Sequence, residues 1–194
     1  MTLNRPFVLN QHRKLEGLHA RLSPSQYHWV NYDEDKFLRV LASQEAAAKG
    51  DRLHELAMRM IRDGIKLPRS PKTLNMYVND AIGYRMTPEQ TLFFSPEFFG
   101  TADALKFTIS KMHLRIHDLK TGVTPAKVTQ LELYCALFCL EYGFAPFELT
   151  MEARIYQNDE VQIFDVDPDI VFRMMEKAKF FDKLIRERKE AELS

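Results

Sequence analysis

Cysteine is scarce in this sequence, and neither sign of charge is in excess. The 194 residues include two cysteines, Cys135 and Cys139, and equal numbers of basic and acidic residues, 27 of each. A disulfide between two cysteines on one predicted helix would be a poor framework for a whole domain, so we expect free thiols and a reducing cytoplasm. Zero net charge excludes a global basic field that would draw the chain to nucleic acid.

Long apolar runs are also absent. Hydrophobic residues make up 45% of the chain, which is enough for a core, but no run approaches the length that spans a bilayer. Residues 1–6 contain no apolar stretch of the signal-peptide type. Because no repeat, low-complexity segment or linker divides the chain, we expect a single domain, 1–194, with no membrane partner. It would carry a helical or irregular N-terminal extension, 1–49, and a C-terminal helix, 168–194.

Charge is unevenly placed along the chain, although it sums to zero. Residues 1–24 carry a net charge of +3, whereas residues 147–169 carry a net charge of −6. A polyanion would therefore have to approach from the side away from the acidic segment.

Helical periodicity marks the first half of the chain. Apolar residues recur at three- and four-residue steps between 33 and 62 and again between 73 and 84, which predicts helices there. Gly50 interrupts the first pattern, so one kinked helix and two separate helices both fit it. Ser23 followed by Pro24 is typical of a helix start, with the serine as the cap and the proline at the first helical position.

Strand-like segments follow in the middle of the chain. The segments 90–94, 98–109 and 112–119 are separated by short turns and are predicted to form an antiparallel meander. Two further strands are predicted over 148–156 and 161–164, joined by a turn.

Two more helices complete the predicted order of elements. Thr124 as the cap and Pro125 at the first position predict a helix that ends before Gly143, and apolar residues on more than one side predict its burial. A last helix is predicted from Asp167–Pro168 to about Glu192. The order of helices, three strands, helix, two strands and helix predicts one α/β (α+β) domain.

Two aspartates interrupt the apolar strands of the meander. Asp103 and Asp118 fall on adjacent strands, and buried carboxylates near each other repel. A hard cation such as Mg²⁺ or Mn²⁺ resolves this repulsion through oxygen coordination. Either aspartate alone also fits a simpler interpretation, in which it caps a turn or pairs with a nearby cationic side chain.

Lys120 favours the metal interpretation. Because side chains alternate along a strand, Asp118 and Lys120 point to the same face and could address the same phosphate. Leu119 would point into the core, with its main-chain carbonyl within reach of a metal. His117 would lie on the opposite face, where we expect packing or surface.

Three residues on predicted helices could complete such a site. The neutral imidazole of His54 could join the two carboxylates, or it could be a hydrogen-bonded core residue. Gln130 and Tyr134 are four residues apart and share one helix face. They could contact a phosphate or a base, or they could simply pack the helix.

Four segments in chain order carry a family resemblance: Gly50-x-x-x-His54, Gly100-Thr101-Ala102-Asp103, Asp118-Leu119-Lys120-Thr121-Gly122 and Gln130-x-x-x-Tyr134. They resemble the motifs of the RecB-like branch of the PD-(D/E)XK nucleases, which includes the nuclease domains of RecB and AddB and the exonucleases of CRISPR spacer acquisition. The whole chain looks most like small stand-alone nuclease-like proteins encoded by bacteriophages, which would place it in the host cytoplasm.

The resemblance implies a restriction-endonuclease-like core with a central mixed β-sheet flanked by helices. It implies a Mg²⁺ or Mn²⁺ ion held by four ligands: His54, Asp103, Asp118 and the carbonyl of Leu119. It makes Asp103, Asp118 and Lys120 catalytic, with Gln130 and Tyr134 supporting the site or contacting DNA. Ala102 stands where the family name has proline, which is usual in this branch. Two cysteines cannot supply the four-cysteine iron–sulfur cluster of some relatives, so we expect none.

The expected function is that of a metal-dependent DNA nuclease, in particular an exonuclease, in phage recombination, repair or replication. Because no helicase segment is present, any helicase would be a separate partner, as would a phage recombinase or a single-strand-binding protein. The alternative is a DNA-binding or assembly factor with little or no activity. An RNA substrate also stays open, because the motif addresses a phosphate and not a sugar.

Overall fold

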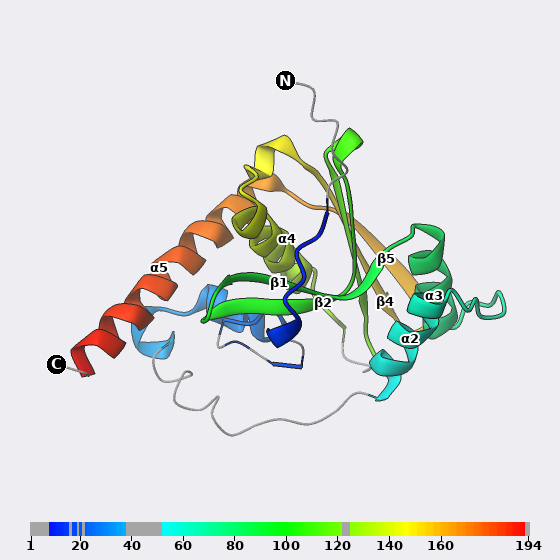
Figure 1. Ribbon diagram of the computed structural model, residues 1–194, viewed down its shortest axis with the longest axis horizontal. Coiled ribbons are helices and arrows are strands. Elements are labelled where there is room, and N and C mark those ends of the chain that lie inside the picture. Colours follow the sequence, from blue (N-terminus) through cyan, green and yellow to red (C-terminus); the bar gives the residue numbers. More distant parts are fainter. Residues whose placement is uncertain are drawn as a thin grey trace.

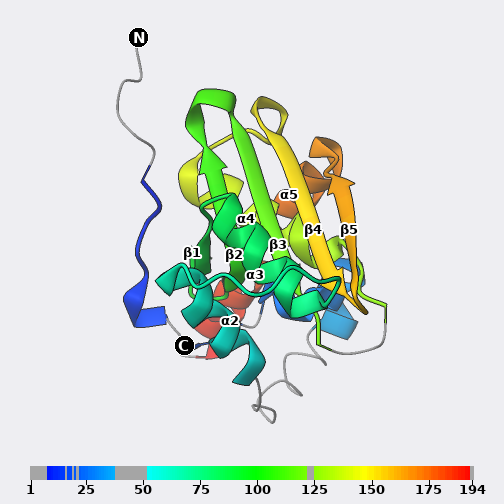
Figure 2. The same ribbon diagram turned by 90° about the vertical axis from the view of Figure 1, so that its right-hand side faces the viewer.

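A five-stranded mixed sheet with helices on both faces forms the centre of the molecule (Figure 1, Figure 2). The computed structural model describes residues 8–37 apart from 16, 19 and 21, then 52–121 and 125–192. This arrangement confirms the predicted α/β (α+β) class with a central mixed sheet flanked by helices. Among the described helices, none combines the length and the hydropathy needed to span a bilayer.

The strands follow one another across the sheet in the order β1-β2-β3-β4-β5. The first three, β1 (Thr87–Ser95), β2 (Phe98–Thr108) and β3 (His113–Leu119), form the predicted antiparallel meander. β4 (Thr150–Gln157) pairs parallel to β3, and β5 (Glu160–Asp165) pairs antiparallel to β4. β1 begins three residues before the predicted start at residue 90.

The parallel pairing of β3 and β4 requires a crossover, which the helix α4 (Thr129–Tyr142) provides. α4 packs between the sheet and α5 (Pro168–Glu192), so it is apolar and buried on several sides, as predicted. Gly143 ends it in the left-handed conformation, with φ of 72°, and its N–H donates to the carbonyl of Cys139.

The start of α4 differs from the prediction. Thr124, the predicted cap, lies outside the described residues, and the helix begins at Thr129. Pro125, predicted at the first helical position, precedes the helix. The N–H of Ala126 donates to the side chain of Gln157 over 2.9 Å, and this bond to the end of β4 holds the preceding segment outside the helix.

Two shorter helices, α2 (Arg52–Asp63) and α3 (Thr73–Gly83), cover the other face of the sheet (Figure 2). α3 occupies the predicted segment. Residues 34–37 are also helical, but the segment between them and α2, including Gly50, lies outside the described residues, so the choice between one and two helices stays a prediction.

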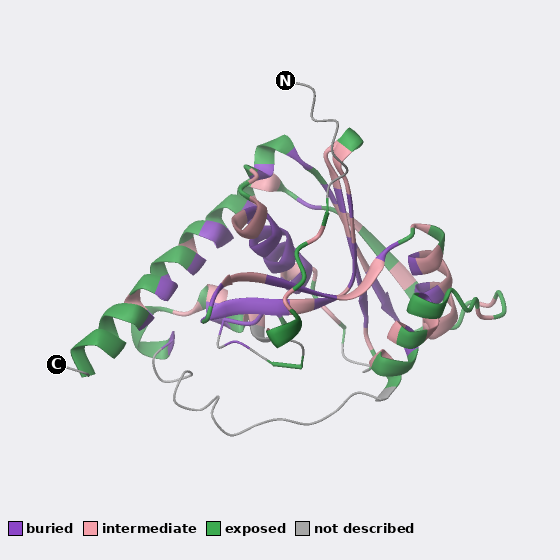
Figure 3. Cartoon of the chain, in the orientation of Figure 1, coloured by how far each residue is buried: buried purple, intermediate pink, exposed green. Residues whose placement is uncertain are grey.

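A 3₁₀ helix, η2 (Pro24–Asn31), joins the N-terminal extension to the larger core. It starts at Pro24 as predicted, but the Ser23 hydroxyl does not cap it and instead bonds to the hydroxyl of Ser25 over 2.8 Å. Trp29 packs edge-on against Phe98, with ring centroids 5.7 Å apart. Figure 3 shows buried residues along the strands and α4, whereas the outer side of α5 is exposed.

Candidate functional site

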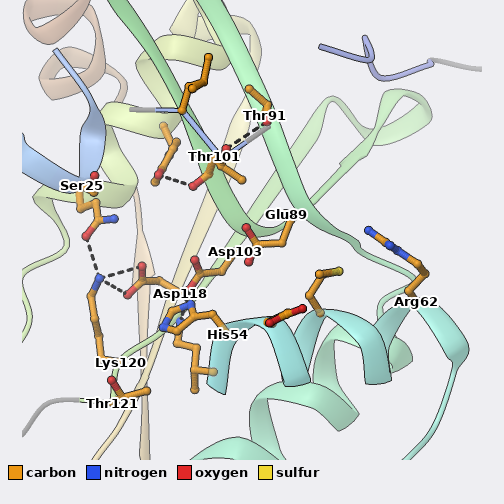
Figure 4. Close-up of a pocket in the computed structure, with 17 residues that line it drawn as sticks. Ser25, His54, Arg62, Glu89, Thr91, Thr101, Asp103, Asp118, Lys120 and Thr121 are labelled. Carbon is orange, nitrogen blue, oxygen red and sulfur yellow. Dashed lines mark hydrogen bonds and ion pairs between the residues drawn. The ribbon is translucent and has the colours of Figure 1, made fainter. Parts of the chain in front are cut away.

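A pocket of about 600 Å³ opens between α2 and the strands β1, β2 and β3 (Figure 4). The residues singled out from the sequence all line it: His54, Asp103, Asp118, Leu119, Lys120, Gln130 and Tyr134. His54 comes from α2, and Asp103 from β2. Asp118 and Leu119 come from β3, Lys120 from the segment after it, and Gln130 and Tyr134 from α4. The fold therefore brings together residues that are far apart in the sequence.

Asp103 stands where β2 and β3 separate. Their last ladder pair joins Ala104 and His117, and beyond it the Asp103 side chain accepts the N–H of Leu119 at Oδ2 over 2.8 Å. In an antiparallel strand the N–H and C=O of one residue point to the same side. The Leu119 carbonyl is therefore directed toward the same gap, beside the Asp103 carboxylate.

Asp118 is the most deeply buried carboxylate of the pocket, with 3% of its surface exposed. The ammonium of Lys120 donates to its Oδ1 over 3.0 Å and to Oε1 of Gln130 over 2.8 Å. Burial and the nearby Asp103 raise the pKa of Asp118 above its ordinary value, and Lys120 opposes that shift. The side-chain alternation predicted for Asp118 and Lys120 is thus present.

His54 projects from α2 toward Asp103, with Nδ1 3.4 Å from Oδ2 (Figure 4). The imidazole reaches the edge of the sheet because α2 packs against β1. Its side chain is 22% exposed, so it borders the pocket and is not a core residue.

Glu89 belongs to the pocket and was not identified from the sequence. It lies on β1, and its carboxylate, that of Asp103 and the ring of His54 offer ligand atoms that all lie within 4.8 Å of one another. Burial and Asp103 raise the pKa of Glu89 to about 7. The predicted strand began at Gln90, one residue too late to include it. The register shifts between Phe93 and Ser95, so counting back from the turn would have placed Glu89 opposite Ala104, and no local signal identified it.

Gln130 and Tyr134 face the pocket from α4 in different roles. Gln130 accepts a hydrogen bond from Lys120, whereas the Tyr134 hydroxyl donates to the carbonyl of Thr101 on β2. Tyr134 is 4% exposed, so little of its ring is available to stack on a base. Thr101 also bonds through its hydroxyl to that of Thr91, over 3.0 Å, at the β1 side of the pocket.

The donor set fits a hard divalent cation. Carboxylate and carbonyl oxygens with one imidazole are typical ligands of Mg²⁺ and Mn²⁺. Asp118 Oδ2 is buried and accepts no hydrogen bond, but it lies 3.0 Å from Nζ of Lys120 in an ion pair. The Lys120 ammonium offsets part of the charge of this carboxylate, so the fit to a divalent cation rests on the oxygen-rich donor set.

Several other titratable side chains lie outside the pocket. His117 is fully buried on the opposite face of β3, against Tyr156, and its burial lowers its pKa to about 3. Asp167 accepts the N–H of Asp169 at the start of α5, which is a helix cap. Cys135 and Cys139 are buried free thiols on α4.

No family model, curated protein or solved structure matches this chain. The likeness to RecB-like nucleases therefore depends on the four sequence segments alone. The geometry is independent of that likeness, because the pocket would be the same whatever the family.

Proposed function

We propose that the chain is a Mg²⁺- or Mn²⁺-dependent DNA nuclease of the RecB-like PD-(D/E)XK type. The observation that carries the proposal is the meeting of Asp103, Asp118, Lys120 and His54 in one pocket, where the Lys120 ammonium is ion-paired with the buried Asp118. Two adjacent carboxylates with a fixed lysine are the parts needed to hold a cation against a phosphodiester.

The cation would be held by His54, Asp103, Asp118 and the Leu119 carbonyl. When bound, it would supply hydroxide from a water ligand at neutral pH and neutralise charge on the phosphate. The ammonium of Lys120 has three N–H donors, of which Asp118 and Gln130 take two. The third can donate to a phosphate oxygen, where it stabilises the charge that develops in the transition state.

The four sequence segments support the finer parts of the proposal. They favour exonuclease action in phage recombination, repair or replication, with a recombinase, helicase or single-strand-binding protein as separate partners. DNA is the expected substrate. RNA is tested beside it, because the side chains of the pocket would contact a phosphate, which both nucleic acids contain.

An inactive DNA-binding or assembly factor with the same fold is the second candidate. Zero net charge and the net charge of −6 over 147–169 favour it, because neither attracts a polyanion strongly. This candidate predicts DNA or partner binding without turnover in any metal.

Digestion of linear DNA separates the two candidates. Wild-type protein is incubated with Mn²⁺ and single-stranded DNA, double-stranded DNA or RNA, beside Asp118→Asn and Lys120→Ala. Lys127→Ala is the matched control, since Lys127 is exposed and does not line the pocket. We expect each site variant to lose about 10²-fold or more of the cleavage rate and the control to retain it. Equal cleavage by all four proteins would refute this site, and no cleavage by wild type would favour the binding factor.

A further inference from the structure

We infer that Arg62 binds a phosphate beside the one that is cleaved, so that the nucleic-acid strand crosses the pocket from Lys120 to Arg62. The inference rests on the proposed function and adds a second anchor for its substrate. Arg62 belongs to the last turn of α2, the helix that also carries His54. It is not among the residues that the family resemblance implies.

Positive charge lies at two ends of the pocket. Among the described residues, Arg62 and Lys120 are the arginine and lysine side chains that line it, and they lie at opposite ends (Figure 4). Lys120 is ion-paired with Asp118. At the other end, burial raises the pKa of Glu89 and the charge of Arg62 opposes that rise. The carboxylates therefore lie between two cationic side chains.

The guanidinium of Arg62 is available to a ligand. Its side chain is exposed, and within the part of the chain that the structure describes it has no hydrogen bond or ion pair. Arg59, three residues earlier on the same helix, is different. It pairs with Glu55 and does not line the pocket. Of the two arginines, Arg62 is therefore the one placed to bind substrate.

The spacing along α2 directs Arg62 to a neighbouring phosphate. His54, Met58 and Arg62 are four residues apart, so they share one helix face, and all three line the pocket. A rise of 1.5 Å per residue separates His54 and Arg62 by about 12 Å along the helix axis. His54 would hold the cation at the cleaved phosphate, so Arg62 reaches a different one. Met58, half-buried between them, offers an apolar contact to a sugar or base.

The charge of the pocket gives Arg62 a reason to be there. Four carboxylates line the pocket and would repel a strand: Glu55, Glu89, Asp103 and Asp118. A guanidinium is permanently charged, and its planar fork of N–H donors matches two phosphate oxygens. A chain with zero net charge would thus hold a polyanion through local contacts and not through an overall field.

Two substrates separate Arg62 from the cleavage site. Bis(4-nitrophenyl) phosphate has one phosphodiester and no neighbouring phosphate, whereas a single-stranded oligonucleotide has both. With Mn²⁺, Arg62→Gln should raise KM for the oligonucleotide by about 10-fold or more, with a smaller change in kcat, and should leave the small substrate unaffected. Arg62→Lys, which keeps the charge, should recover part of the loss. Arg59→Gln is the matched control and should behave as wild type on both substrates.

Binding without cleavage gives a second readout. Asp118→Asn protein without divalent cations is mixed with a fluorescent oligodeoxythymidylate, and anisotropy measures Kd at several salt concentrations. Each phosphate neutralised on a single strand contributes about 0.7 to the slope of log K against log salt concentration. Adding Arg62→Gln should lower the slope by about that amount, and adding Arg59→Gln should not change it.

The outcomes separate this inference from the proposed function. A wild-type KM and salt slope in Arg62→Gln would overturn the inference and leave the proposed function intact. Equal losses on both substrates would also overturn it, because Arg62 would then act on the cleavage site or on the fold. No cleavage of either substrate by wild type would overturn the proposed function, and the salt slope would still decide whether Arg62 binds a phosphate.

Discussion

Glu89 and Asp103 face each other across the antiparallel strands β1 and β2, and their side chains share the pocket with His54. Two like charges at opposed positions oppose folding. The sheet keeps them because the β1–β2 ladder continues on both sides of the pair and Asp103 is anchored by the N–H of Leu119. The fold therefore holds two mutually repelling carboxylates in the pocket, and a bound cation would relieve that repulsion.

Replacing Glu89 by glutamine should change the pH dependence of stability in metal-free protein. Burial and Asp103 raise the pKa of Glu89 from 4.5 to about 7, so between these values the folded state holds a proton that the unfolded state has released. The contribution of Glu89 to the free energy of unfolding therefore falls as the pH rises from about 4.5 to about 7.

Glu89→Gln should lack this decline and should be the more stable protein at about pH 8, by about 1–2 kcal/mol after allowance for solvent screening. Urea unfolding in the presence of a chelator, at several pH values, measures the difference. Glu55→Gln should follow wild type, since its side chain is 53% exposed. Parallel pH profiles for wild type and Glu89→Gln would contradict the prediction.

Adding Mg²⁺ or Mn²⁺ to chelator-treated protein should raise its Tm. An ion that binds the folded state alone adds about 2.7 kcal/mol to the free energy of unfolding at about 100 times its Kd. Asp103→Asn should abolish the increase, whereas Asp63→Asn, an exposed substitution at the end of α2, should preserve it. Differential scanning fluorimetry at constant ionic strength measures the shift. A wild-type Tm that neither cation changes would count against a metal site.

Local rules predicted most of the strands and the pairing of Asp118 with Lys120. Side-chain alternation depends on two residues of one strand, so it could be read without knowing the fold. Glu89 could not be found in that way, because its place opposite Asp103 depends on the register of two strands and on the true start of β1. It also has a positive φ of 48°, which departs from a regular strand.

The start of α4 shows the same limit. Thr124 and Pro125 carry good local signals for a helix start, yet the helix begins at Thr129. A hydrogen bond from Ala126 to Gln157, 31 positions along the chain, holds the segment outside the helix. A contact of that kind has no local signature, since tertiary structure overrides the propensity.

Gln130→Ala should lower kcat by about 10-fold or more with a smaller change in KM. Gln130 acts through Lys120, because it accepts one hydrogen bond of the ammonium that also contacts Asp118. Without it the lysine would be held by one acceptor, and loss of position at a reacting centre is costly. Gln162→Ala, an exposed change on β5, is the matched control. Gln130→Glu, which keeps an acceptor oxygen, should recover part of the rate, and an unchanged kcat in Gln130→Ala would contradict the positioning role.

Gly100→Ala should destabilise the protein by about 1–3 kcal/mol, because a Cβ at Gly100 would lie 2.6 Å from Pro24 Cδ and 3.3 Å from the ring of Tyr134. The pyrrolidine ring of Pro24, at the start of η2, is rigid, so the backbone of η2 or β2 would have to shift to make room. Gly83→Ala at the end of α3 is the matched control, since nothing lies within 4 Å of its Cβ position.

Replacing Gly83 should leave stability unchanged or raise it by up to about 1 kcal/mol, because alanine favours the helix. Thermal and urea unfolding of both variants measure the contrast. If Gly100→Ala were as stable as Gly83→Ala, the close approach of η2 to β2, which carries Ser25 to the rim of the pocket, could not be a constraint on the fold.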